Sequence, residues 1–322
     1  MIRIGLLGAS KIAPAAVIAP AAANPQFRVT AVAARDPARA RAYAETHAIP
    51  GVAAGYAELV RRGDVDVVYN ALPPAAHAEW TIAALEAGKA VLCEKPFAMD
   101  AAQARSMVDA AEVRGLMLLE AFHYRHHQVF RRAEALVKGG ALGALRRARA
   151  EFRVTVARGP QELRWRADLG GGGLMDLGCY PVHALRTLVG TAPEIASATA
   201  TFEGGVDVDL SASLVFAGGV EAQIACAMKA PAPAASLTLE GDRGRVEIIN
   251  FLAPQLGCRF TTTLDGVTTV QPTDGPSTYA AQLADLAEVL AGRARPLTGG
   301  TDAIANMAAI EAIYAAAGRP AL

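Results

Sequence analysis

The chain has 322 residues, of which 52% are hydrophobic, and its 31 Lys and Arg residues balance its 31 Asp and Glu residues. This length predicts about two domains with a large buried core, and the zero net charge gives no reason to expect nucleic acid or a membrane surface as a partner. The cysteines, at 93, 179, 226 and 258, form no Cys-x-x-Cys motif, which argues against disulfides or structural zinc and favours a cytoplasmic enzyme.

Up to about residue 121, short apolar runs alternate with segments of helical periodicity. The runs are too short for a membrane span, and the first one fits a buried strand better than a signal peptide. Strands are expected at 2–8, 27–34, 66–72, 89–93 and 116–121, and helices at 37–47, 75–87 and 100–114. This alternation predicts an α/β fold with a doubly wound parallel sheet of the Rossmann type, a dinucleotide-binding domain over residues 1–122.

The second half of the chain has a different pattern. A helix is expected near 126–138, a long strand near 144–157, and a helix over 174–188 after a glycine run at 170–173. Further strands are expected at 194–203, 206–217, 219–228, 235–240, 245–250, 258–264 and 267–271, and helices at 277–292 and 301–317. Residues 123–322 should therefore form an α+β domain for substrate binding and oligomerisation, with a large, mostly antiparallel open sheet. One free face of that sheet would suit a homodimer or homotetramer; whether helix 301–317 packs on the first domain stays open.

The first predicted strand ends in GASKIA, residues 8–13. This matches the dinucleotide fingerprint G-x-G-x-x-G/A except that Ser10 replaces the middle glycine. Gly8 permits the tight turn, the following helix presents its N-terminus to a pyrophosphate, and Ala13 allows close packing. The Ser10 hydroxyl is able to donate to the phosphate. By itself the motif is weak, and a βα turn that merely contains glycine is an equal alternative.

The second predicted strand ends in AVAARD, residues 31–36. NAD-specific proteins usually place an acidic residue there for the ribose 2′-hydroxyl, but this chain has Ala34 followed by Arg35. A guanidinium pairs with a 2′-phosphate and stacks on adenine, so we expect NADP(H) to be preferred, with NAD(H) as the alternative. Asp36 competes for a ribose contact, although Pro37 after it indicates a helix N-cap.

Three further motifs occur together. Glu94-Lys95-Pro96 follows a predicted strand, at the edge where α/β sheets bind ligands, and the proline predicts a cis bond after Lys95. PPAAH (73–77) follows the preceding strand, and GGGLMDLGCY (171–180) lies in the second half. With GLLGASKIA, AVAARD and KAVLCEKP, the sequence resembles the glucose–fructose oxidoreductase / inositol dehydrogenase (Gfo/Idh/MocA) family over essentially its whole length. Within that family it is most similar to the dihydrodiol dehydrogenase and NADP-dependent xylose dehydrogenase branch.

The resemblance implies hydride transfer between a nicotinamide cofactor and a hydroxyl or carbonyl group of a sugar, polyol or diol, with Lys95 beside the reacting oxygen. The family commonly carries Asp-x-x-x-His after the glycines, whereas this chain has Asp176 and Tyr180, as the dihydrodiol and glucose–fructose branches do. Tyr180 is then the expected acid/base, assisted by the ammonium of Lys95. Asp176 would bind a substrate hydroxyl or orient Lys95.

Spacing alone places Asp176, Tyr180 and His183 on one face of a helix. His183 is either a second acid/base or substrate ligand, or a buried structural histidine. Arg125 is expected near the cleft, and the histidines beside it do not converge on one point, so no metal site is predicted. Trp165 and Arg166 suit a sugar face and its hydroxyls, with a subunit contact as the alternative.

His77 is expected either to line the cofactor cleft or to cap a helix. The full predicted cofactor-binding set is Gly8, Ser10, Lys11, Ile12, Arg35, Leu72, Pro73, His77, Glu94, Lys95 and Pro96.

Two other functions stay open at this point. One is a glycosidase that uses tightly held NAD(H) in an internal redox cycle, and the other is a non-catalytic regulator that senses the cofactor. The presence of Lys95 and Tyr180 argues against a sensor, which needs neither residue. The substrate itself is undetermined among pentoses, hexoses, inositols, aryl diols and nucleotide-linked keto-sugars.

Overall fold

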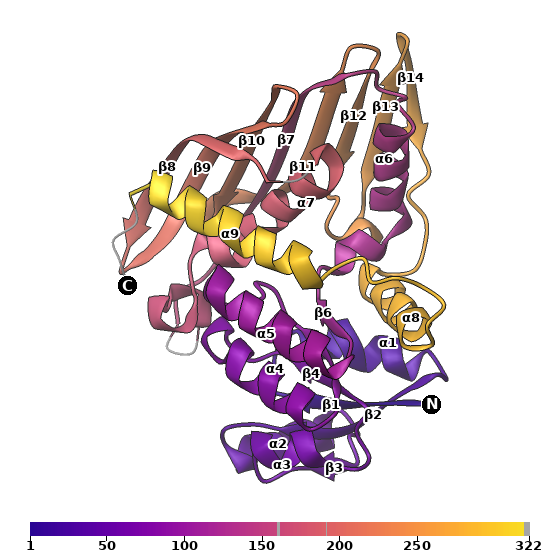
Figure 1. Cartoon of the computed structure of the whole chain (residues 1–322), viewed down its shortest axis with the longest axis vertical. Helices are drawn as coiled ribbons and strands as arrows, with labels where there is room; N and C mark the ends of the chain where they lie inside the picture. The colour runs from indigo at the N-terminus through magenta and orange to yellow at the C-terminus, as the bar shows by residue number, and fades with distance from the viewer. Residues whose placement is uncertain (160–161, 191, 319–322) are drawn as a thin grey trace. The chain divides into compact units, whose positions relative to one another are not determined.

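The computed structural model describes residues 1–159, 162–190 and 192–318, which form two compact units (Figure 1). The first unit contains residues 1–122 and 279–304, and the second contains residues 123–278 and those from 305 onward. The chain therefore passes between the units three times. The return of residues 279–304 to the first unit is a feature that the expected boundaries did not contain.

The first unit contains a six-stranded sheet in which every pair of neighbours is parallel. Its order is β3-β2-β1-β4-β5-β6, the strand order typical of dinucleotide-binding folds. The strands are β1 (Ile2–Leu7), β2 (Phe27–Ala33), β3 (Gly51–Val52), β4 (Val67–Asn70), β5 (Ala90–Cys93) and β6 (Leu118–Glu120). The predicted parallel sheet is confirmed. Its continuous apolar strands are buried, as a sheet covered on both faces requires.

Helices of the first unit begin where the sequence provides caps. Asp36 accepts from the N–H of Ala38 at 2.9 Å and Asp100 from that of Gln103 at 2.7 Å, so the N-cap interpretation of Asp36 is confirmed. The helices are η1 (Pro14–Ile18, a π-helical turn), α1 (Ala19–Ala22), α2 (Pro37–Thr46), α3 (Tyr56–Arg61), η2 (Pro74–Ala76), α4 (His77–Glu86) and α5 (Ala101–Arg114). Helix α8 (Thr278–Leu290) adds Leu283 and Leu286 to the core of this unit.

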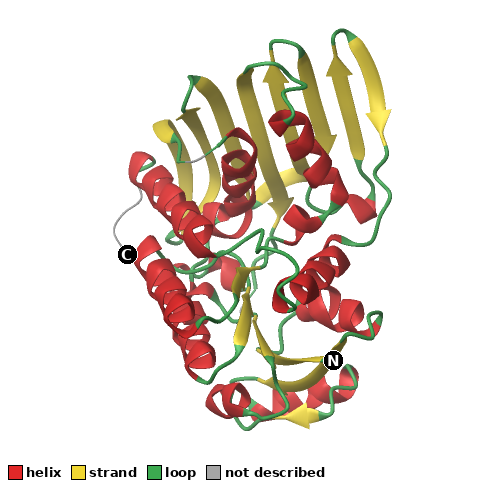
Figure 2. Cartoon of the chain, turned by 45° about the vertical axis from the view of Figure 1, so that its right-hand side comes forward, coloured by secondary structure: helices red, strands yellow, loops and turns green. Residues whose placement is uncertain are grey.

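The second unit is built on an eight-stranded sheet (Figure 2) of order β14-β13-β12-β11-β7-β10-β9-β8. Its neighbours are antiparallel except β7 and β10, which run parallel, so the predicted mostly antiparallel sheet is confirmed. The strands are β7 (Leu145–Thr155), β8 (Glu194–Glu203), β9 (Val206–Phe216), β10 (Val220–Ala227), β11 (Lys229–Gly241), β12 (Gly244–Ile249), β13 (Arg259–Leu264) and β14 (Val267–Gln271). Strand β11 begins earlier than expected, at Lys229, because a break in its register accommodates two prolines that mask it in the sequence.

Apolar residues of this sheet, such as Leu210 and Leu214 of β9, are buried, while Ser211 between them is exposed. Helix α7 packs against β7 and β10. The helical elements are η3 (His123–His126), α6 (Gln128–Lys138), η4 (Leu163–Trp165), η5 (Ala167–Leu169), η6 (Leu174–Gly178), α7 (Cys179–Val189), η7 (Pro254–Leu256) and α9 (Gly300–Ala316), whose first residues belong to the first unit. Across the described parts of the chain, none of the helices combines the length and apolar character that a membrane crossing needs.

Candidate active site

The turn after β1 has the geometry of a phosphate-binding loop. Gly8 has a φ of +95°, and a Cβ there would lie 3.2 Å from the carbonyl oxygen of Ala71. Ser10 Oγ accepts from the N–H of Ala13 at 3.2 Å, which leaves the hydroxyl hydrogen available to donate outward. Lys11 and Ile12 are exposed at the start of the following helix. The turn therefore fits a dinucleotide phosphate: glycine opens the approach, and a hydroxyl and a helix N-terminus face it.

Two side chains of α2, the helix that follows the adjacent strand β2, hold this loop. Arg39 Nη2 donates to the carbonyl oxygen of Ala9 at 2.8 Å, and the Tyr43 hydroxyl donates to that of Ser10 at 2.9 Å. Arg35 is exposed at the end of β2. Neither Arg39 nor Tyr43 was predicted as a site residue, because their contacts are with backbone atoms about 30 residues away. Two guanidinium groups thus stand in the region where NAD-specific proteins place an acid.

The Glu94-Lys95-Pro96 turn is fixed by several contacts. The Lys95–Pro96 peptide bond is cis, as predicted, and Glu94 Oε1 accepts from the Tyr69 hydroxyl at 2.5 Å. Burial raises the pKa of Tyr279 to about 12, with the charge of Glu94 acting in the same direction and that of Lys95 opposing it. Tyr279 therefore lies close enough to the turn for the charges of Glu94 and Lys95 to act on it. No local pattern in the sequence predicts this proximity.

His77 is buried and contacts two other predicted residues. Its Nε2 lies 2.8 Å from the carbonyl oxygen of Leu72, and its Nδ1 lies 3.0 Å from that of Pro96. Burial lowers the pKa of the imidazole to about 4. The N-cap of α4 is Ala76, and His77 is the first residue of the helix, so His77 does not act as the helix cap. Its ring instead joins the loop after β4, which also contains Pro73, to the turn after β5.

In the second unit, Asp207 anchors the glycine run and the helix after it. Its Oδ2 accepts from the N–H of Leu174 at 2.6 Å, and its Oδ1 accepts from the Tyr314 hydroxyl at 2.6 Å. A Cβ on Gly172, whose φ is +125°, would collide with Oδ1. The glycines therefore admit a buried carboxylate to the start of the helix that carries Tyr180, where an anion is favoured. Asp207 was not predicted as a site residue.

Tyr180 lies in a cluster of aromatic and imidazole rings. Its hydroxyl is 3.3 Å from His123 Nε2, and its ring makes edge contacts with Tyr124 and Phe152. His183 is fully buried, with its Nδ1 2.6 Å from the Tyr124 hydroxyl. Tyr180 and His183 thus both face Tyr124. For His183, this geometry supports the structural alternative.

The remaining predicted substrate residues form ion pairs or, for Trp165, a cation–π contact with charged neighbours. Asp176 lies in the π-helical turn η6, where hydrogen bonds run from i to i+5, so the regular helix expected from residue 174 begins only at Cys179. The Asp176 carboxylate is 3.7 Å from Arg164. The other contacts are Arg125 with Glu134 at 2.7 Å, Arg166 with Asp168 at 2.6 Å, and Trp165 under the guanidinium of Arg158 at 4.1 Å.

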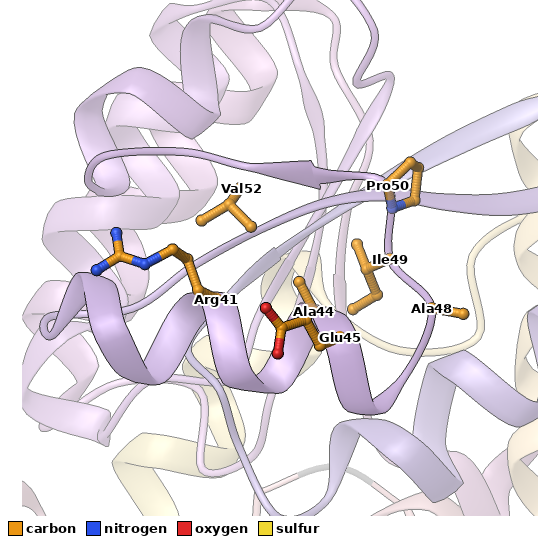
Figure 3. A pocket seen from close by; sticks show the side chains of 7 residues that line it. All are labelled: Arg41, Ala44, Glu45, Ala48, Ile49, Pro50 and Val52. Atoms are coloured by element: carbon orange, nitrogen blue, oxygen red, sulfur yellow. The ribbon is translucent and has the colours of Figure 1, made fainter.

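A surface hollow of about 410 Å³ lies beside α2 and β3 in the first unit (Figure 3). It is lined by Arg41, Ala44, Glu45, Ala48, Ile49, Pro50 and Val52. None of these residues belongs to the predicted site, and most of them present alkyl groups. The turn after β1 and the Glu94-Lys95-Pro96 turn lie instead at the carboxyl ends of the parallel strands, the edge where α/β sheets bind ligands.

Comparison with known proteins gives matches to both units. Residues 2–122 match the NAD-binding Rossmann fold of the Gfo/Idh/MocA oxidoreductase family, and residues 130–247 match a C-terminal domain of that family. The D-xylose 1-dehydrogenase (NADP(+)) 2 of Haloferax volcanii is 32% identical over 97% of this chain and 96% of its own length.

A dTDP-3,4-didehydro-2,6-dideoxy-alpha-D-glucose 3-reductase of Streptomyces violaceoruber is 41% identical over 65% of this chain, and the match spans 60% of that relative's length. Among solved structures, the aldose-aldose oxidoreductase of Caulobacter crescentus, complexed with glycerol, superposes with a TM-score of 0.90 at 29% identity. That superposition covers 98% of this chain and 97% of the other.

Proposed function

Since the chain belongs to the Gfo/Idh/MocA oxidoreductase family, we propose that it is an NADP(H)-dependent enzyme that interconverts a hydroxyl and a carbonyl group on a sugar, polyol or diol. The first unit would hold the dinucleotide and the second the substrate. The observation that carries the proposal is the phosphate loop at Gly8 with Arg35 and Arg39 beside it. Relatives named for action on xylose and on a nucleotide-linked keto-sugar support a polyhydroxylated substrate.

The preference for NADP(H) follows from the charges at the end of β2. The Asp36 carboxylate accepts from the N–H of Ala38 and is thereby committed to the helix. Arg35 is exposed, and Arg39 reaches the loop backbone through Nη2, which leaves other N–H groups of its guanidinium for a ligand. Two guanidinium groups suit a 2′-phosphate and offer no acceptor to a ribose 2′-hydroxyl.

For the chemical step we propose Lys95 and Tyr180 as the polarising and acid/base pair. When bound, the nicotinamide supplies or accepts the hydride. Lys95 would stabilise negative charge on the reacting oxygen, and Tyr180 would donate the proton to it in the reductive direction. The contacts of His77 with the carbonyl oxygens of Leu72 and Pro96 hold the turn that presents the lysine. Asp176, held by Arg164, would bind a second hydroxyl, and His183 would support the helix.

The experiment begins with titration by NADPH and NADH, followed by assays at 340 nm with NADP+ and four alcohols: D-xylose, D-glucose, myo-inositol and trans-cyclohexane-1,2-diol. We expect NADPH to bind more tightly and at least one alcohol to be oxidised. Lys95→Met and Tyr180→Phe should each reduce kcat by about 100-fold or more while the NADPH dissociation constant stays within about threefold. Normal turnover in both variants would contradict the assignment, and binding without any redox turnover would favour an internally cycling glycosidase or a sensor.

Arg35→Ala and Arg39→Ala test the cofactor preference. Each should weaken NADPH binding by about tenfold, the loss of one charge-assisted contact. NADH binding should stay nearly unchanged in Arg35→Ala, and it should weaken less than NADPH binding in Arg39→Ala, which also releases the backbone of the phosphate loop. Equal losses for the two cofactors would contradict the 2′-phosphate argument. Assembly as a homodimer or homotetramer through the exposed sheet face is a further part of the proposal, which analytical ultracentrifugation tests.

A further inference from the structure

His123 stands between Tyr180 and a buried threonine hydroxyl. Its Nε2 is 3.3 Å from the Tyr180 hydroxyl, and its Nδ1 is 2.8 Å from Thr278 Oγ1. Tyr180 is 6% exposed, His123 7% and Thr278 0%, so the ring bridges two hydroxyl groups in a region shielded from water. An imidazole with both nitrogens in contact with hydroxyls is able to accept a proton at one nitrogen and release one at the other.

The contacts continue from Thr278 to the surface. The N–H of Thr278 donates to Gln255 Oε1 at 3.4 Å, and Gln255 Nε2 donates to Thr278 Oγ1 at 3.4 Å. These two contacts fix which end of the amide faces the hydroxyl. Gln255 is exposed, in the short helix η7. A line of polar groups therefore runs from the buried phenol of Tyr180 through His123 and Thr278 to solvent-accessible Gln255.

We propose that His123 is a positioning residue that relays protons between Tyr180 and Thr278 along this line. The proposal rests on the proposed function, in which Tyr180 is the acid/base. In the reductive direction, the Tyr180 O–H bond breaks as its proton passes to the substrate oxygen. The tyrosinate oxygen then takes a proton from His123 Nε2, and the imidazole regains one at Nδ1 from the Thr278 side. In the oxidative direction, each transfer runs in reverse. The Thr278 hydroxyl then gives its own proton to solvent, since the Gln255 amide nitrogen that faces it is a donor and not an acceptor. The hydride itself is exchanged with the nicotinamide dinucleotide. In the reductive direction, Thr278 regains its proton from solvent, which restores the starting protonation of the three side chains.

The same cluster provides a matched control. Tyr124 and His183 form a second buried phenol–imidazole contact, at 2.6 Å, and the rings of Tyr124 and Tyr180 are 5.9 Å apart. Tyr124→Phe removes a hydrogen bond of the same kind from the same packing environment. A purely structural role for His123 predicts that variants of the two pairs behave alike, whereas a relay predicts that only His123 affects proton transfer.

The test compares His123→Ala, His123→Gln and Tyr124→Phe in the oxidation of D-xylose by NADP+, or of the best alcohol of the screen above if D-xylose is not turned over. In His123→Ala we expect kcat to fall by about tenfold or more, with KM within about twofold. Added imidazole should restore kcat in proportion to its concentration. In His123→Gln, which keeps a hydrogen-bonding group but has no nitrogen that accepts and releases a proton, kcat should stay low without rescue by imidazole. Tyr124→Phe should show no response to imidazole.

A double-variant cycle separates the relay from the function on which it rests. If His123 acts through Tyr180, adding His123→Ala to Tyr180→Phe should reduce kcat no further. A loss in His123→Ala that adds fully to that of Tyr180→Phe, or that imidazole fails to restore in folded protein, would overturn the relay. Full activity in Tyr180→Phe would instead overturn the acid/base assignment itself.

A second measurement covers the case in which His123→Ala does not fold. In ¹⁵N-histidine NMR spectra of otherwise intact protein, Tyr180→Phe should shift the Nε2 signal of His123, and Thr278→Val should shift its Nδ1 signal. Thr278→Val should also lower kcat, while Thr278→Ser should retain it. Unchanged nitrogen signals, or equal kcat in the valine and serine variants, would contradict the proposed line.

Discussion

The buried imidazole of His77 should make the protein sensitive to mild acid. Burial is the largest cause that lowers its pKa to about 4, the charge of Lys95 acts in the same direction, and hydrogen bonds to three carbonyl groups oppose it. In the unfolded chain the pKa returns to about 6.5. Because the unfolded state binds the proton first, the contribution of His77 is fully present above about pH 6.5 and is lost as the pH falls towards 4. From these two values, the free energy of unfolding should drop by about 2 kcal/mol between pH 8 and pH 5.

The assay is urea unfolding followed by circular dichroism at pH 8, 6.5, 5.5 and 5, for the natural sequence and for His77→Gln. The glutamine amide is able to donate to one of the carbonyl groups and does not titrate, so this variant should be less stable at pH 8 but should lose less stability on acidification. Burial also lowers the pKa of His127, whose contribution is common to both proteins. The difference between their pH dependences therefore isolates His77.

An opposite result would have a defined structural meaning. A neutral imidazole has one N–H, yet both ring nitrogens of His77 face carbonyl oxygens, and a cationic ring would satisfy both sides. If the geometry outweighed burial, acid would preserve or increase stability between pH 6.5 and pH 5. Equal losses in the natural sequence and in His77→Gln would refute the argument that His77 is held neutral.

Two further predictions concern buried charges in the second unit. Arg125→Met should destabilise the protein by about 3 kcal/mol in urea unfolding, because it deprives the largely buried Glu134 of two hydrogen bonds. The double variant Arg125→Met/Glu134→Leu should recover much of this loss. If it recovers none, the packing of the arginine stem and not its charge is what stabilises the protein. Asp207→Ala should lower the free energy of unfolding by about 3 kcal/mol, since it leaves the N–H of Leu174 and the Tyr314 hydroxyl without this acceptor. Tyr314→Phe should lower it less, because the contact between Asp207 and Leu174 stays in place. A larger effect in Tyr314→Phe would contradict this ranking.

Local chemistry explains the parts of the fold that were predictable. Asp36 caps a helix where it was expected to do so, and Asp100 caps the predicted helix at 100–114, because capping needs only a side chain and a backbone N–H two or three residues away. Most of the buried parallel strands lie in short but continuous apolar runs, so their existence was also predictable. Strand β3, with two residues, and helix α3, with six, are too short to show a clear hydrophobic repeat, so neither was predicted from the sequence.

The site was less predictable than the fold because its contacts join distant segments. Pattern reasoning selected Tyr180 but not His123 or Thr278 as its partners, although His123 and Thr278 are hydrogen-bonded across 155 positions. The helical spacing of Asp176 and Tyr180 was extrapolated from a regular helix, whereas a π-helical turn separates the two residues. Periodicity contains information about the neighbours of a residue on its own element, and none about which element packs against it.

The glycine run before Tyr180 illustrates how a motif and its cause differ. A glycine-rich segment at a site invites the interpretation that glycine leaves room for substrate. In this chain, a Cβ at Gly171 would lie 2.6 Å from the carbonyl oxygen of Arg164, and one at Gly172 would collide with Asp207. The glycines are thus required by contacts within the protein, which join the loop containing Arg164 and the strand containing Asp207 to the start of the helix. It follows that substitution of these glycines would impair Tyr180 by displacing its helix, and that the resulting loss would appear in folding stability as well as in turnover.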